Sequence, residues 1–173
     1  IIEFPSSFRS VTADEVRELV KELDPEIRPV GVFVNAPMEL VRTLLDDGTL
    51  ALAQLHGQEN EDYIRQLKTM TDQLLIKAFS IKTADDMENS LQSPADYILL
   101  DQGSGGTGKT FDWSLIPKIE RPFFLAGGIG EENLEQALRE IHPFAVDLSS
   151  SVETEKWKDP KKIRQVVDIV RRI

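Results

Sequence analysis

Short apolar runs alternate with amphipathic stretches along most of this chain. The runs have the length of buried strands, and they fall at residues 29–34, 50–55, 74–79, 97–100, 123–126 and 144–148, with 1–4 as a seventh. The stretches between them repeat apolar residues at helical spacing, which predicts helices over 13–23, 38–45, 59–70, 84–91, 132–141 and 160–172. Thr12, Thr83 and Asp159 precede three of these helices as expected N-caps.

This alternation indicates the fold class. Runs that are apolar throughout and separated by single helices predict a parallel sheet that is buried on both faces. The runs begin roughly two dozen residues apart, a repeat that suits the β/α units of a (β/α)₈ barrel. Because seven runs fall one short of eight, we expect one barrel domain over residues 1–173, with strand 1 and helix 1 absent from the chain. A doubly wound open sheet, which needs no closure, is the alternative.

Composition narrows the class of protein and its partners. With 173 residues and 40% hydrophobic content the chain can form one ordinary globular core. The formal net charge of −10 argues against nucleic acid or an anionic membrane surface as a partner. No apolar run is long enough to cross a bilayer and no secretion signal is visible, so we expect a cytoplasmic protein. The chain has no cysteine, which excludes thiol catalysis by these residues.

One glycine-rich segment supports two incompatible interpretations. Residues 103–110, GSGGTGKT, match the G-x-x-x-x-G-K-[ST] pattern that cradles nucleotide phosphates. They can also form a mobile loop after a strand that ends in a catalytic acid, Asp101. A P-loop is followed by a helix of several turns, whereas Pro117 and Pro122 leave room here for barely two. Asp101 would also repel a phosphate, so the pattern favours the mobile loop.

Two later turns are suited to binding a phosphate without a lysine. Gly127 and Gly128 follow one apolar run and allow backbone amides to approach a ligand closely. Ser149 and Ser150 follow the next run and supply hydroxyls and amides. Barrels of this kind often bind phosphate with the loops after strands seven and eight, which these turns become if a first unit is absent. Either turn alone could be a simple turn or cap, but together they predict a phosphate site.

Four titratable side chains lie at predicted strand ends or beside them. Asp101 and Asp147 end apolar runs, where a carboxylate is a candidate for acid or base chemistry or else caps a helix. His56 closes the segment LAQLHG as a ligand-binding or a structural histidine. Arg9 is a candidate clamp for a substrate carboxylate, with a surface salt bridge as the alternative.

Six segments resemble, in order and spacing, those of phosphoribosylanthranilate isomerase, an enzyme of tryptophan biosynthesis. They are FPSSFRSV, VGVFVNAP, QLHGQE, YILLDQGSGGTGKTFDW, LAGGIGEENL and PFAVDLSSSVE. The resemblance implies a (β/α)₈ barrel and an Amadori rearrangement of N-(5-phosphoribosyl)anthranilate to 1-(2-carboxyphenylamino)-1-deoxyribulose 5-phosphate. It also implies a phosphorylated small molecule as substrate and no metal or organic cofactor. We further expect a monomer or homodimer.

The same resemblance implies roles for individual residues. Asp101 matches the general acid that protonates the furanose ring oxygen, and Arg9 matches the arginine that holds the anthranilate carboxylate. His56 matches a motif histidine of the substrate site. The phosphate-binding residues are matched by Gly127, Gly128, Asp147, Ser149 and Ser150.

The chain departs from the family at the general base. The family's base is a cysteine after the first strand, and these residues contain neither that segment nor any cysteine. An active isomerase whose first unit lies outside the chain is therefore one hypothesis, and a non-catalytic phosphate-binding barrel is another. A sugar-phosphate lyase or epimerase would need a pair of strand lysines or metal-binding histidines, and only Lys77 lies within a predicted strand.

Overall fold

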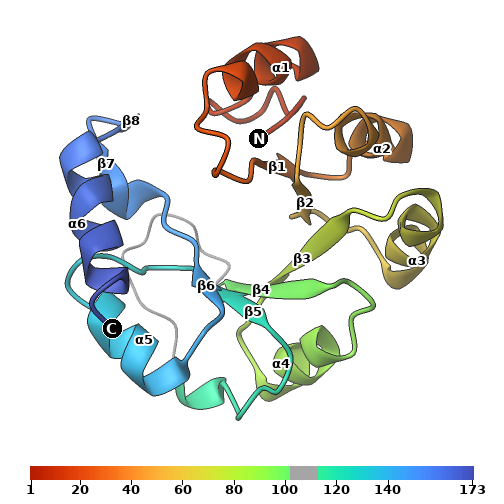
Figure 1. Cartoon of the computed structure of the whole chain (residues 1–173). Coiled ribbons are helices and arrows are strands. Elements are labelled where there is room, and N and C mark those ends of the chain that lie inside the picture. Colours follow the sequence, from red (N-terminus) through yellow and green to blue (C-terminus); the bar gives the residue numbers. More distant parts are fainter. Residues whose placement is uncertain (102–112) are drawn as a thin grey trace. The chain divides into compact units, whose positions relative to one another are not determined.

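The computed structural model describes residues 1–101 and 113–173, and over these residues strands and helices alternate along the chain (Figure 1). The chain divides into two compact units. Unit 1 comprises Ile1–Ala78 and Ser93–Tyr97, and unit 2 comprises Phe79–Gln92 and Ile98–Ile173.

Unit 1 is built from parallel strands that neighbour one another in chain order. Strand β1 (Val30–Phe33) pairs with β2 (Leu52–Leu55), and β2 pairs with β3 (Leu74–Ser80), which runs on into unit 2. The helices of this unit are α1 (Ala13–Lys21), α2 (Met38–Asp46) and α3 (Glu61–Met70). Apart from residues 1–4, strands and helices therefore lie close to where the apolar runs and the helical spacing predict them.

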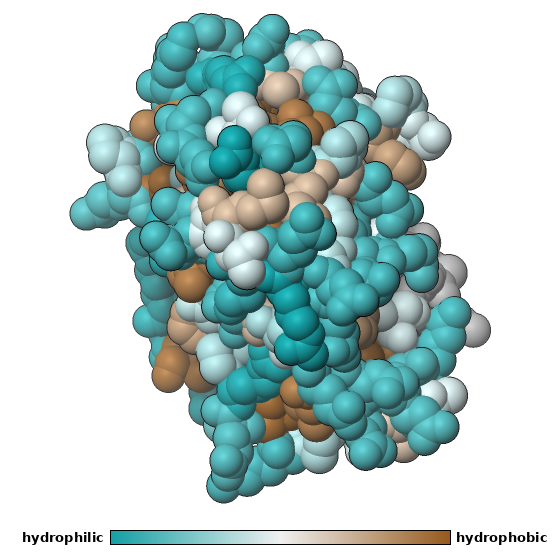
Figure 2. All heavy atoms as spheres, turned by 90° about the vertical axis from the view of Figure 1, so that its right-hand side faces the viewer, coloured by the Kyte–Doolittle hydropathy of each residue, from teal (hydrophilic) through white to brown (hydrophobic). Residues whose placement is uncertain are grey.

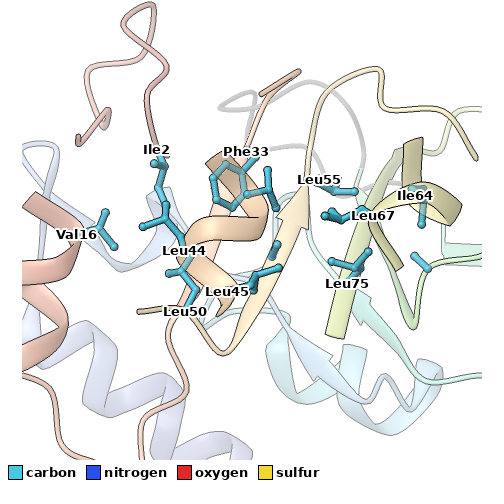
Figure 3. Packing of buried hydrophobic residues seen from close by; sticks show 13 residues of the cluster. Ile2, Val16, Phe33, Leu44, Leu45, Leu50, Leu55, Ile64, Leu67 and Leu75 are labelled. Carbon is cyan, nitrogen blue, oxygen red and sulfur yellow. The ribbon is translucent and has the colours of Figure 1, made fainter. Parts of the chain in front are cut away.

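The core of unit 1 lies between the strands and their helices (Figure 3). Strand residues Phe33, Leu55 and Leu75 are fully buried, and so are Leu44 from α2 and Leu67 from α3. Truncating one such side chain to alanine costs about 2–5 kcal/mol. The helices turn their polar faces outward, and Figure 2 shows that the side of the molecule carrying α2 and α3 is mainly hydrophilic.

The opening residues 1–4 do not form the strand expected there. Ile2 forms a single parallel bridge with Val11 and donates its N–H to the Val32 carbonyl at 2.9 Å. Glu3 then has φ = 50°, outside the extended region, and Pro5 has no N–H to continue a ladder. The expectation of a strand over 1–4 was therefore wrong apart from Ile2.

Unit 2 contains a second set of parallel strands. Strand β4 (Tyr97–Asp101), which begins in unit 1, pairs with β5 (Phe123–Leu125), and β5 pairs with β6 (Ala145–Val146). A short antiparallel hairpin follows, made by β7 (Glu153–Thr154) and β8 (Trp157–Lys158). The helices are α4 (Ala84–Leu91), α5 (Leu134–Ile141), α6 (Pro160–Val170) and the 3₁₀ turns η1 (Trp113–Leu115) and η2 (Ser150–Val152).

The three predicted N-caps are confirmed. Thr12 and Thr83 each accept a hydrogen bond from the third helical N–H, and the acid at that position, Glu15 or Asp86, bonds back to the cap N–H. Asp159 accepts from the Lys161 N–H, ahead of a proline at the first helical position. In the described part of the chain, no helix has the length and apolar character required to span a membrane.

Candidate active site

The carboxyl ends of three strands in unit 2 lie level with one another. Leu100 of β4 is in register with Leu125 of β5, which is in register with Val146 of β6. Two further bonds continue the ladder past the strands, from the Ala126 N–H to the Leu100 carbonyl at 2.9 Å and from the Asp147 N–H to the Leu125 carbonyl at 2.8 Å. Chain segments that leave these strands therefore start from one edge of the sheet.

Asp101 is the last residue of β4 and stands at this edge. Asp101 is half-buried. Its backbone carbonyl accepts a hydrogen bond from the Ile81 N–H at 2.8 Å, which holds the backbone in place. Asp147 occupies the matching position after β6. Because neighbouring strands lie about 4.8 Å apart, the backbones at Asp101 and Asp147 are separated by roughly 10 Å across β5.

The turn after β5 requires glycine. Gly127 has φ = 80° and Gly128 has φ = 69°, a left-handed conformation that residues with a Cβ rarely adopt. Asn133 holds the turn from behind, because its Nδ2 donates to the Gly128 carbonyl and its Oδ1 accepts the Gly130 N–H, both at 2.9 Å. The backbone of the turn is therefore fixed by the protein itself.

The turn after β6 carries the predicted serines. Ser149 has φ = −115° and ψ = −82° and directly precedes η2, and both it and Ser150 are exposed. Val152 is buried in the core of unit 2 and anchors the turn from the inside. Asp101, the glycine pair and the serine pair thus follow the carboxyl ends of three adjacent strands at one edge of the sheet.

The remaining predicted residues, Arg9 and His56, belong to unit 1. The Arg9 guanidinium lies over the Phe8 ring with its Cζ 4.2 Å from the ring centroid, and the Arg9 N–H donates to the Ser7 hydroxyl at 3.1 Å. His56 directly follows β2, is exposed, and has its Nδ1 2.8 Å from the Gln54 Oε1. His56 therefore lies at the carboxyl end of its strand, as expected.

A buried ion pair follows His56 in the chain and was not predicted. The Lys77 ammonium donates to the Glu59 carboxylate at 3.0 Å, to the Gly57 carbonyl at 2.7 Å and to the Leu55 carbonyl at 3.2 Å. The two side chains are 7% and 1% exposed. Sequence reasoning singled out the lysine and missed Glu59. A lysine inside an apolar run signals that a buried acid must exist nearby, since an unpaired charge there would be very costly.

Glu59 also joins the segments that follow β1 and β2. It accepts the Asn35 N–H at 2.6 Å and the Gly57 N–H at 2.9 Å. Burial, together with the Glu59 carboxylate, raises the pKa of Tyr63 to about 12, so its hydroxyl stays protonated and donates to the Ala36 carbonyl at 3.1 Å. These bonds commit Lys77 to a structural network, which further weakens the interpretation as a lysine-dependent lyase.

The P-loop motif at 103–110 lies outside the described residues. The structure resumes at Trp113, where the chain makes the single 3₁₀ turn η1 and forms no other helix before β5. The phosphate-binding helix of a P-loop would have to run several turns beyond Thr110. The described residues after 112 therefore contradict the nucleotide-binding interpretation.

The comparisons with known proteins agree with one another. The family model for N-(5'-phosphoribosyl)anthranilate (PRA) isomerase matches residues 1–169. The N-(5'-phosphoribosyl)anthranilate isomerase of Thermoanaerobacter sp. (strain X514) is 39% identical over 176 residues, which cover 98% of this chain and 85% of that protein.

Solved structures give the same result. The crystal structure of phosphoribosyl anthranilate isomerase from Thermotoga maritima has a TM-score of 0.88 and 35% identity, covering 100% of this chain and 87% of its own. Another isomerase structure, in complex with reduced 1-(o-carboxyphenylamino)-1-deoxyribulose 5-phosphate, has a TM-score of 0.82 and 31% identity, covering 100% and 86%.

These matches confirm the resemblance seen in the motifs and the expected (β/α)₈ barrel fold. The family model extends over nearly the whole chain, and the relatives' identity lies well above the level at which only a fold is shared. The chain therefore belongs to the family of N-(5'-phosphoribosyl)anthranilate isomerases, which act in tryptophan biosynthesis.

Proposed function

We propose that Asp101 is the general acid of the isomerase reaction and that the turns after β5 and β6 bind the substrate's phosphate. The reaction is the Amadori rearrangement of N-(5'-phosphoribosyl)anthranilate to 1-(2-carboxyphenylamino)-1-deoxyribulose 5-phosphate. The observation that carries the proposal is the level register of β4, β5 and β6, which delivers one carboxyl and two amide-rich turns to the same edge of the sheet.

Asp101 would deliver a proton to the furanose ring oxygen. Ring opening converts the glycosylamine carbon into an iminium, and loss of the C2 proton then gives an enolamine that tautomerises to the ketone. The acid has to be a single carboxyl held at a fixed position near the ring, and the bond from Ile81 to the Asp101 carbonyl supports such a position. We assign the base step to no residue of this chain, which contains no cysteine.

The phosphate would be bound by uncharged backbone donors. Gly127 and Gly128 carry no side chain, so a ligand can approach the amides of their turn closely, and Ser149 and Ser150 add hydroxyls and a further turn. Asp147 contributes its backbone, which bonds to β5 and so sets the start of the serine turn. Uncharged donors suit a chain whose net charge of −10 supplies no excess of cations for an anionic ligand.

In unit 1, we propose that Arg9 binds the anthranilate carboxylate and that His56 contacts the substrate. The Arg9 guanidinium lies over the exposed Phe8 ring, and its planar fork of donors can bind a carboxylate with two hydrogen bonds. The hydrogen bond between the His56 Nδ1 and the Gln54 Oε1 fixes the orientation of the His56 ring. We further propose that residues 1–173 belong to one barrel domain and that the protein acts in the cytoplasm as a monomer or homodimer, without a metal or organic cofactor.

An Asp101→Asn variant of the full-length protein tests the acid role. Turnover, followed by the loss of fluorescence of the anthranilate substrate, should fall about 10²–10⁴-fold in kcat while KM changes little, because the amide cannot donate an acidic proton. Asp72→Asn is the matched control, since Asp72 is exposed and precedes the opposite, amino end of β3. Turnover of Asp101→Asn near the parent rate would remove Asp101 from the acid role.

A further inference from the structure

The β7–β8 hairpin brings a lysine onto the serine turn. Lys158, paired with Glu153 across the hairpin, donates from its ammonium to the Ser149 carbonyl at 2.9 Å and to the Glu153 carboxylate at 2.9 Å. The Lys158 side chain is 49% exposed, and that of Glu153 only 8%. The motifs that identify the family do not explain this contact.

The hairpin that supplies Lys158 is itself fixed in place. The Thr154 hydroxyl of β7 donates to the carboxylate of Asp159, the N-cap of α6, at 2.8 Å, and the Asp159 N–H donates to the carbonyl of Val152, the residue before β7, at 2.9 Å. Lys162 from α6 donates to the Glu153 carbonyl at 2.6 Å. The hairpin backbone that carries Lys158 is therefore held to α6 by hydrogen bonds.

A bond to the Ser149 carbonyl has a geometric consequence for the next amide. In a trans peptide the carbonyl of one residue and the N–H of the following residue point in opposite directions. Holding the Ser149 carbonyl toward Lys158 therefore aims the Ser150 N–H away from the hairpin. A cationic donor on the carbonyl also polarises the peptide, which strengthens the N–H as a donor.

We propose that Lys158 is a positioning residue for the phosphate group: it orients the peptide between Ser149 and Ser150 so that its N–H meets the phosphate. This inference rests on the proposed phosphate site. Lys158 acts through the peptide and not as a free positive charge, because Glu153 balances its ammonium. Its loss should weaken phosphate binding and leave proton transfer at the ring nearly unchanged.

The test compares Lys158→Met, Lys158→Arg and Lys161→Met in the full-length protein. Three quantities are measured for each: KM and kcat for N-(5'-phosphoribosyl)anthranilate, and Ki for inorganic phosphate as a competitive inhibitor. Lys158→Met should raise KM and the phosphate Ki together, roughly 5–20-fold, because the bond from the Ser150 N–H to the charged phosphate is weakened and not removed, with kcat within about twofold. Lys158→Arg keeps a cationic donor, so its KM and its phosphate Ki should stay close to those of the parent protein.

Lys161→Met removes the same charge from an exposed position in the first turn of α6 and should change none of the three quantities. Equal effects at 158 and 161 would show a general loss of charge and overturn the inference. So would a Lys158→Met protein with lowered thermal stability but an unchanged phosphate Ki, because only a structural role would remain.

The outcome also separates this inference from the proposed function. If Gly128→Ala raises KM and the phosphate Ki while Lys158→Met does not, the phosphate site stands and the role of Lys158 is refuted. If phosphate does not compete with the substrate in the parent enzyme, the phosphate site itself is refuted, together with the role of Lys158.

Discussion

Replacing Lys77 by methionine should destabilise the protein far more than removing a surface lysine. Methionine keeps most of the length and the apolar stem of lysine but has no ammonium to donate to Glu59, Gly57 and Leu55. The Glu59 side chain is only 1% exposed, so its charge would remain buried without its partner. The substitution therefore leaves a buried carboxylate without its ion-pair partner and changes the packing volume little.

The magnitude follows from that burial. Breaking a buried ion pair on one side costs about 3–5 kcal/mol. Glu59 keeps its bonds from the Asn35 and Gly57 N–H groups, which still stabilise the carboxylate, so the lower end of that range, about 3 kcal/mol, applies. For a chain of this length such a loss lowers the melting temperature by roughly 6–12 °C.

Urea denaturation followed by circular dichroism measures the effect, with an unchanged m-value showing that the same surface is exposed. Arg139→Met is the control, since it removes an exposed helix pair with Glu135 that contributes about 0.3–0.5 kcal/mol. Glu59→Gln should cost less in the Lys77→Met background than in the parent, because the stranded charge is then gone. A loss below about 1 kcal/mol for Lys77→Met would refute the reasoning, since that is the range of solvent-screened pairs.

Two further predictions concern titration. The Lys82 N–H and the Thr83 hydroxyl and N–H hold the pKa of Asp86 below its usual 3.8, so the stability that this cap contributes is present above that pH and lost as the pH falls through the folded-state value. An NMR titration of the Asp86 carboxyl carbon should give a midpoint below 3.8, and a midpoint at or above it would contradict the cap. Burial and Glu59 raise the pKa of Tyr63 to about 12, so its contribution is present below pH 10 and lost on the way to 12. Absorbance at the tyrosinate band should show one late ionisation that Tyr63→Phe removes, and an unchanged curve in that variant would contradict the assignment.

Local sequence patterns predicted most of the strands and helices. Apolar runs placed β1 to β6 within a few residues, because a strand buried on both faces must be apolar along its whole length. Thr12, Thr83 and Asp159 marked helix starts because their side chains satisfy amides that no helix can pair internally. The strand over residues 1–4 failed because the backbone turns at Glu3, which hydropathy does not record.

The candidate site was less accessible to sequence reasoning. Asp101, the glycine turn and the serine turn could be placed at strand ends, but their common level depends on the register of β4, β5 and β6, which only the structure gives. Glu59 and Lys158 were missed for a related reason. Glu59 pairs with Lys77 through tertiary packing, and Lys158 reaches Ser149 through a hairpin. No spacing of residues along the sequence predicts either contact.

The two hydrogen bonds between the Asn133 side chain and the glycine turn link folding to ligand affinity. Since the two side-chain bonds shape the turn before any ligand arrives, the entropy needed to order those amides is lost during folding and not during binding. If this turn binds phosphate as proposed, the ligand binds only the folded state, and by mass action it stabilises the fold by RT ln(1 + [L]/Kd). The metabolite would thus protect the enzyme that consumes it from unfolding, and more so as it accumulates.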